Sequence, residues 1–150
     1  MATIFDAVPF LAAYSVSFLV LAAIALMTLI QNFATAPLAF VNEEQVPGLP
    51  LRFDHSKLSF RAVRTYSNSA ETFPAFGWAV LMAISSGAWP LLVNWLAIGY
   101  FIARVAFWVI YYAGIGKPAG GPRTMAFVAG LLCNIALACM AAWSLAKVVI

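Results

Sequence analysis

The sequence predicts an all-α integral membrane protein, a four-helix bundle, from two observations: its composition and the spacing of its charges. Of 150 residues, 65% are apolar, and only 8 Lys or Arg and 5 Asp or Glu carry charge. Soluble domains are about 25% charged, so 9% charged residues are too few to cover a surface that faces water. Lipid must therefore solvate much of the chain, which argues strongly against a cytosolic enzyme.

The first predicted span covers residues 9–30, which include no charged side chain. At about 1.5 Å per residue, a helix of this length crosses the roughly 30 Å hydrocarbon core of a bilayer. A cleavable signal peptide is the alternative, because residues 34–36 are small like a cleavage site. The one charge upstream is Asp6, however, whereas a signal peptide has cations there and a shorter apolar run. We therefore expect a retained helix.

Three further spans follow from the next charge-free stretches. Residues 72–103 are uncharged but too long for one crossing, and the segment from Ser85 to Pro90 breaks them, which predicts two helices joined by a tight turn. Pro74 lies within the first of these helices, where it predicts a kink. The predicted spans two to four are 59–85, 90–113 and 123–149. The chain is thus expected to be a single four-span membrane domain, residues 1–150.

Loop charges predict the orientation of the spans. Cations flank the connection between spans one and two and the connection between spans three and four, whereas the N-terminus and the turn between spans two and three have none. These cations are Arg52, Lys57, Arg61, Arg64, Lys117 and Arg123. By the positive-inside rule, both basic loops face the cytoplasm and both termini lie on the opposite side. With no retention or transit signal visible, we expect a bacterial inner membrane.

A polar stripe begins the second span. Arg61, Arg64, Asn68 and Glu71 are spaced so that, at about 100° per residue, they share one helix face. An interfacial arginine cluster that binds anionic lipid headgroups is one reading of this stripe. A binding site for a small polyanion is the other.

The third span contains a lone arginine, Arg104, with apolar neighbours for a turn on each side. A cation at this depth is costly, so it should face the bundle interior or a water-filled cavity and have a partner. Tyr111 lies seven residues on, on the same helix face. A structural ion pair of Arg104 with Glu71 is the alternative to a role in binding.

Several kinds of site are not predicted. The sequence offers no nucleophilic triad, no paired carboxylates and no phosphate-binding glycine loop. Cys133 and Cys139 lie in an apolar segment and His55 is the only histidine, so neither a metal site nor a disulfide is indicated. The cations are scattered rather than clustered, which excludes nucleic acid as a partner. Any catalysis would rest on arginines and tyrosines, which can stabilise an anionic nucleophile.

The segment from Arg61 to Phe76 resembles the RxxRAxxNxxExxPxF signature of the MAPEG family, the membrane-associated proteins in eicosanoid and glutathione metabolism. Supporting similarities are Ala103-Arg104, the run from Tyr111 to Ile115, and the run from Pro122 to Phe127. The resemblance covers nearly the whole chain. The members that the chain resembles are microsomal glutathione transferases and leukotriene synthases. It implies a homotrimer of four-helix bundles with glutathione, as co-substrate, bound between subunits on the cytoplasmic side.

The resemblance also implies roles for particular residues. Arg64, Asn68 and Glu71 of one subunit, with Arg61 at the start of the motif, would bind the glutathione backbone, and Arg104 and Tyr111 of the adjacent subunit would close the pocket. Arg123 matches the arginine that activates the thiol. Lys117 is a competing candidate, because the loop before Arg123 is a few residues longer than expected.

Three functions are compatible with these observations. The first is a glutathione-dependent membrane transferase or peroxidase acting on lipophilic electrophiles that enter from the bilayer. The second is a non-catalytic MAPEG-like structural or accessory subunit, favoured by Thr72 and Phe107, which stand where several members have tyrosine. The third is a small exporter, for which Glu71 is the only candidate to couple protons.

Overall fold

A computed structural model describes residues 3–41, 54–117 and 120–149. Within these ranges all regular secondary structure is helical, which confirms the predicted all-α class. Its elements are the α-helices α1 (Ile4–Ala7), α2 (Ser15–Val41), α3 (Leu58–Ser85), α4 (Pro90–Tyr112) and α5 (Pro122–Val149), and the 3₁₀-helix η1 (Pro9–Tyr14).

Prolines and glycines set the boundaries of the later helices. Pro90 and Pro122 are the first residues of α4 and α5, where a missing N–H costs nothing and the fixed φ suits a helix. Gly87, at φ 68°, ends α3 in the left-handed conformation, and the Ala88 amide donates to the Ala83 carbonyl at 2.9 Å, as in a Schellman cap. The predicted tight turn between these helices is therefore present.

The first long helix extends further than the sequence predicted. We expected its span to end near residue 30, but α2 continues to Val41, and Pro9–Leu38 is apolar and long enough to cross a membrane. The expected span was a charge-free run just long enough to cross the hydrocarbon core, and the next residue, Gln31, is polar. That residue is 8% exposed, so it lies on the packed side of the helix and does not mark its end.

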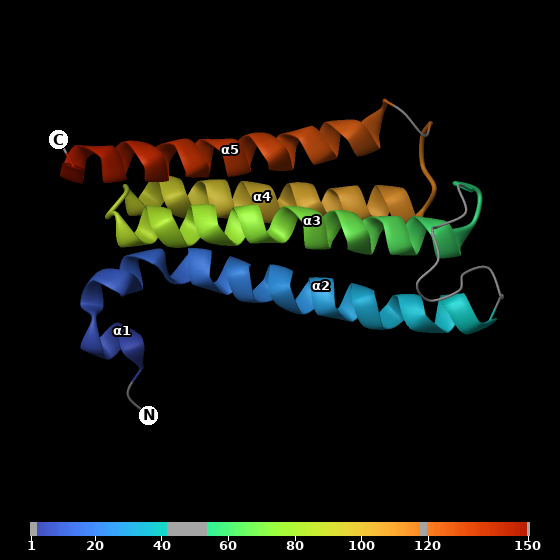
Figure 1. Ribbon diagram of the computed structural model, residues 1–150, viewed down its shortest axis with the longest axis horizontal. Helices are drawn as coiled ribbons and strands as arrows, with labels where there is room; N and C mark the ends of the chain where they lie inside the picture. Colours follow the sequence, from blue (N-terminus) through green and yellow to red (C-terminus); the bar gives the residue numbers. More distant parts are fainter. Residues whose placement is uncertain (1–2, 42–53, 118–119, 150) are drawn as a thin grey trace.

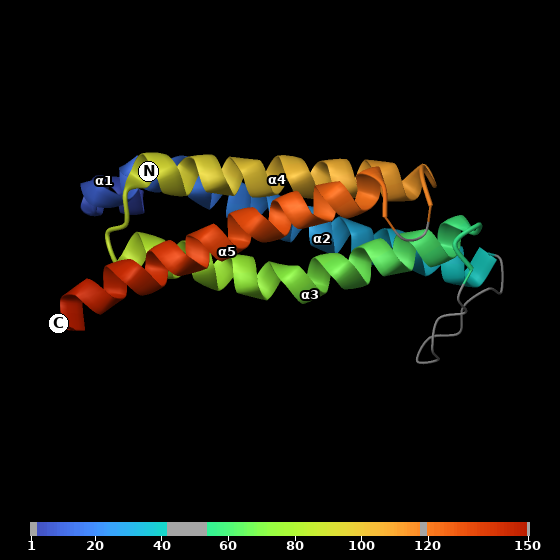
Figure 2. The ribbon, with the colours of Figure 1, turned by 90° about the horizontal axis from the view of Figure 1, so that it is seen from above.

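The four long helices lie side by side (Figure 1). Both ends of the chain and the α3–α4 turn are at one end of the molecule, and the polar start of α3 and the N-terminus of α5 are at the other. Viewed from above, α5 crosses the other helices obliquely (Figure 2). α5 packs against α3 and α4, and α2 packs against α3, α4 and η1.

Three helical segments of the described chain are long and apolar enough to cross a membrane: Pro9–Leu38, Pro90–Tyr112 and Pro122–Lys147. The second predicted span, α3, is not among them, because its first half has the polar stripe. Large apolar side chains face outward along the helices, among them Leu19, Phe33, Trp78 and Trp143, each at least 65% exposed. Such surfaces indicate association with a lipid bilayer.

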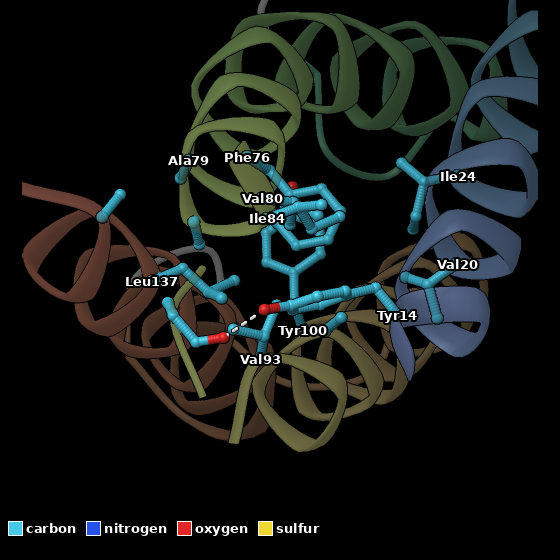
Figure 3. Packing of buried hydrophobic residues seen from close by; sticks show 14 of the residues in the cluster. Tyr14, Val20, Ile24, Phe76, Ala79, Val80, Ile84, Val93, Tyr100 and Leu137 are labelled. Carbon is cyan, nitrogen blue, oxygen red and sulfur yellow. Dashed lines mark hydrogen bonds between the residues drawn. The ribbon is translucent and has the colours of Figure 1, made fainter. Parts of the chain in front are cut away.

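A core of aromatic and aliphatic side chains from all four long helices and η1 holds the helices together (Figure 3). Phe76 of α3 stacks on Tyr100 of α4 with ring centroids 3.8 Å apart. The Tyr14 hydroxyl donates to the Ala88 carbonyl, and Tyr14 itself is fully buried. Along α4 the same core extends to Phe107, Trp108 and Tyr111, and polar groups of α3 and α5 lie next to it at that end.

Candidate functional site

A cavity of about 320 Å³ lies at the polar end of the helices. It is bounded by the start of α3, the end of α4, the start of α5 and the turn before α3. Its lining is His55, Phe60, Arg64, Asn68, Phe107, Tyr111, Arg123, Thr124 and Phe127. The sequence and the family resemblance predicted seven site residues. Four of them line this one cavity: Arg64, Asn68, Tyr111 and Arg123.

The charge of this lining is positive. Arg64 and Arg123 are cations and none of the described lining residues is acidic. Phe60, Phe107 and Phe127 supply an apolar wall on the same cavity. A cavity with two guanidinium groups and aromatic walls suits a small anion that also has an apolar part.

Arg123 is held over an aromatic ring. Its guanidinium carbon lies 4.4 Å from the centroid of the Tyr111 ring, a cation–π contact between α5 and α4. Because Arg123 is the second residue of α5, the positive end of the helix dipole adds to its charge at that place. Lys117, the competing candidate, is exposed and is not part of this lining.

His55 is the site residue that sequence reasoning missed. The Tyr111 hydroxyl lies 3.2 Å from His55 Nδ1, and the two rings are 6.0 Å apart. Burial, and then the positive charges of Arg123 and Arg64, lower the pKa of His55 below its ordinary 6.5, and these effects outweigh the opposing effect of Asp54. A single histidine outside any motif gave no signal that the turn before α3 would bring it here.

Asn68 is positioned by Arg104. The Arg104 guanidinium is buried, at 2% exposed, and its Nη1 donates to Asn68 Oδ1 at 2.8 Å. Its Nη2 donates to Ser69 Oγ at 3.2 Å, which also accepts from Trp108 Nε1 at 2.8 Å. The expectation that Arg104 faces the interior and has partners is met, but the partners are an amide and a hydroxyl.

The alternative reading of Arg104, an ion pair with Glu71, is wrong. Glu71 instead lies 3.8 Å from Arg64, and the two side chains are 59% and 44% exposed. Neither Glu71 nor Arg104 lines the cavity. Glu71 is at its edge beside Arg64, and Arg104 acts through Asn68.

Arg61 donates hydrogen bonds to backbone carbonyls around the site. Its Nη1 donates to the carbonyls of His55 at 2.8 Å and Ser56 at 2.7 Å, and its Nε donates to the Tyr112 carbonyl at 3.4 Å. It thereby ties the turn before α3 to the end of α4, where a cation is favourable. Arg61 lines a smaller neighbouring cavity of about 30 Å³ together with His55, Tyr111 and Arg123.

One chain is sufficient to bring Arg64, Asn68 and Tyr111 together, residues that the resemblance assigned to two subunits. Arg52, one of the loop cations used to predict the orientation, lies outside the described residues. Within the described ranges, no group of three or more potential metal ligands is found.

Comparison with known protein families identifies the family to which this sequence is similar. The model of the MAPEG family matches residues 10–143, a range that includes the cavity lining and all four long helices up to Trp143. No curated protein matches the chain.

Proposed function

Because this chain belongs to the MAPEG family, we propose that it is a glutathione-dependent membrane transferase or peroxidase acting on lipophilic electrophiles. The observation that carries the proposal is the cavity in which Arg64, Asn68, Tyr111 and Arg123 meet beside an aromatic wall. Glutathione has two carboxylates, one ammonium group and one thiol, and these groups match the charges around the cavity.

Each polar group has a complementary partner in the proposed complex. Arg64 and Asn68 bind a carboxylate and the peptide backbone of glutathione. Glu71, 3.8 Å from Arg64 and largely exposed, accepts from the ammonium group. Arg104 fixes the Asn68 side chain by its 2.8 Å hydrogen bond and is a positioning residue.

Arg123 is the proposed activating group for the thiol. A cysteine-like thiol has a pKa near 8.5, so only a few per cent is ionised at neutral pH. Lowering that pKa by about 2 units requires roughly 2.7 kcal/mol of preferential stabilisation of the thiolate. A guanidinium held against the Tyr111 ring, beside the N-terminus of α5, is able to supply it.

The chemistry then belongs to the thiolate. In transfer, the sulfur forms a bond to an electrophilic carbon, which loses its leaving group or opens its ring, and the thiol proton passes to solvent. In peroxidase turnover, two glutathione molecules reduce a hydroperoxide to an alcohol and water and become a disulfide. The phenylalanine wall of the cavity provides the contact for a lipophilic partner that enters from the bilayer.

We also propose the assembly that goes with this activity. Four spans cross a bacterial inner membrane, with the cavity on the cytoplasmic side and both termini on the other, and three copies form a homotrimer. The exposure of Arg64 and Glu71 at the cavity edge supports a neighbouring subunit that covers this side.

A second candidate function is a non-catalytic accessory subunit of the same fold. Phe107 favours it, because an apolar ring lines the cavity where several members of the family have tyrosine. In that case the arginines bind an anionic headgroup or a partner and activate no thiol.

Ultraviolet difference titration of glutathione thiolate on the purified protein tests the proposal. The wild type is expected to show thiolate near neutral pH, and Arg123→Ala is expected to lose that signal, with a thiol pKa about 2 units higher. Lys117→Ala removes an exposed cation outside the cavity and is the matched control, which should behave as wild type.

Protection of the protein against heat unfolding by glutathione distinguishes binding of glutathione from ionisation of its thiol. Glutathione at about 100 times its Kd stabilises the protein by roughly 2.7 kcal/mol, and Arg64→Ala is expected to abolish this protection. If saturating glutathione protects the wild type but yields no thiolate, the accessory reading replaces the catalytic one.

A further inference from the structure

A second, larger cavity of about 480 Å³ lies between α2, α3 and α4. It shares no lining residue with the cavity of about 320 Å³ that contains Arg64 and Arg123, here called the cationic cavity. On α4, Trp108 and Tyr112 line it, whereas Phe107 and Tyr111 line the cationic cavity; at about 100° per residue these pairs lie on different faces. The two cavities are therefore on different sides of the α3–α4 pair.

The walls of this second cavity are apolar and uncharged. No acidic or basic side chain is among its described lining residues, so a charged headgroup would be buried without a partner, at high cost. Ile30 and Val109, on its border, are 57% and 59% exposed. In a membrane-spanning helix these residues face lipid, so the cavity opens toward the bilayer.

One polar atom in this cavity has no partner. The Gln31 side chain is 8% exposed, and its Oε1 is buried without a hydrogen-bond partner in the described structure. Trp108 lines the same cavity, but its indole N–H already donates to Ser69. A buried acceptor left unpaired costs about 1 to 3 kcal/mol, and a donor that enters the cavity would remove that cost.

We propose that this cavity binds a neutral lipid carrying one hydroxyl group, which donates to Gln31 Oε1 while the hydrocarbon chain lies along α2 and α4. A hydroxyl fits because Oε1 accepts and needs a donor, and a neutral molecule fits because the walls have no charge. The site is separate from that of glutathione, and the proposal does not rest on the proposed catalytic function.

Photolabelling with hexadecanol that carries a diazirine in its chain tests this assignment on the purified full chain. Label is expected in the peptides that contain Gln31 and Trp108. Unlabelled hexadecanol should compete about fivefold better than hexadecane, the ratio expected for one net hydrogen bond. Palmitate, which is charged, should compete no better than hexadecane.

Two variants isolate the hydrogen bond. Gln31→Leu is expected to lose the fivefold preference for hexadecanol, whereas Asn32→Leu, which removes an exposed amide of α2 outside the cavity, should retain it. Ala34→Phe, at the cavity rim, is expected to reduce labelling by the diazirine hexadecanol, and this effect does not depend on the buried amide.

Three results would overturn the proposal. One is label spread evenly over the lipid-facing helices. Another is a hexadecanol preference that persists in Gln31→Leu. The third is label seen only in dissociated chains, which would assign this face to a second copy of the protein.

Discussion

At the scale of single residues, Ser69 links α3 to α4 next to Asn68, which lines the cationic cavity. Its hydroxyl donates to the Thr65 carbonyl at 2.9 Å and accepts from both Arg104 and Trp108. Ser85 has the same bond within α3, to the Leu81 carbonyl at 2.8 Å, but it is exposed. Comparing a substitution of Ser69 with one of Ser85 therefore separates the effect of hydrogen bonds between helices from the effect of the bond within α3.

Ser69→Ala is expected to lower the free energy of unfolding by about 2 kcal/mol, because it leaves two buried donors short of an acceptor. It should also weaken glutathione binding, since Arg104 then holds Asn68 less firmly. Chemical unfolding in mixed detergent, with and without glutathione, measures both effects. Ser85→Ala should change stability by less than about 0.5 kcal/mol; equal losses in the two variants would contradict this role of Ser69.

The ionisation of His55 makes the stability of the folded protein depend on pH. Its pKa is lowered by burial and by the charges of Arg123 and Arg64, so the folded protein prefers the neutral ring. Neutral Nδ1 can also accept from the Tyr111 hydroxyl, 3.2 Å away. The stability that depends on the neutral ring is complete above the unfolded pKa of 6.5 and is lost as the pH falls through the lower folded value.

The thermal midpoint of the wild type is therefore expected to fall as the pH is lowered below about 6.5. His55→Gln keeps an acceptor but does not titrate, so its curve should be flatter in this range. Asp54 does not confuse the comparison, because its pKa is lowered from 3.8 by hydrogen bonds to Ser56 and it therefore acts at more acidic pH. Parallel curves for the two proteins would exclude His55 as the source.

At the scale of elements, Asn94 joins α4 to the junction of η1 and α2. Its Oδ1 accepts from the Ser17 hydroxyl at 2.7 Å and the Ser17 amide at 3.2 Å, and its Nδ2 donates to the Ala13 carbonyl at 2.8 Å. Backbone groups at a helix start lack partners within the helix, and here a side chain of another helix supplies them.

Asn94→Ala is expected to open this junction locally. Amide exchange over residues 10–20 should become about tenfold faster, corresponding to a loss of roughly 1.4 kcal/mol, while exchange in α5 stays unchanged. Mass spectrometry of the exchanged peptides measures it. Asn32→Ala, at an exposed amide of α2, is the control; unchanged exchange in Asn94→Ala would show that packing alone fixes the junction.

At the scale of the whole molecule, both termini lie at one end and the basic ends of α3 and α5 lie at the other (Figure 1). This arrangement agrees with an even number of crossings, although three helical segments, not four, meet the criteria of length and apolarity. The polar half of α3 lies beside the cationic cavity, to which it contributes Arg64 and Asn68.

Membrane topology can be checked with single cysteines in a background where Cys133 and Cys139 are replaced by alanine. A cysteine at Lys117 is expected to react with an impermeant maleimide from the cytoplasmic side, and one at Thr3 from the opposite side. Intact cells and inverted vesicles distinguish the two. Reaction of both positions from the same side would contradict the four-span topology.

The sequence alone determined the helical class and most helix boundaries. Charge-free length, Pro90, Pro122 and the Ser85–Pro90 break are local signals, and each acts within one or two turns of its own position. The same is true of the stripe of Arg64, Asn68 and Glu71, which needs only helical periodicity. The family signature added Arg123 to these residues.

Which polar groups meet depends on the packing of the helices. Arg104 binds Asn68 and not Glu71, His55 joins Tyr111, and Gln31 is buried within a longer α2, because each contact depends on how separate helices and turns pack against one another. Helical periodicity gives the face on which a side chain lies, but not the neighbour that it meets there. The physical reason is that a helix is specified by neighbours in sequence, whereas a binding site is specified by neighbours in space.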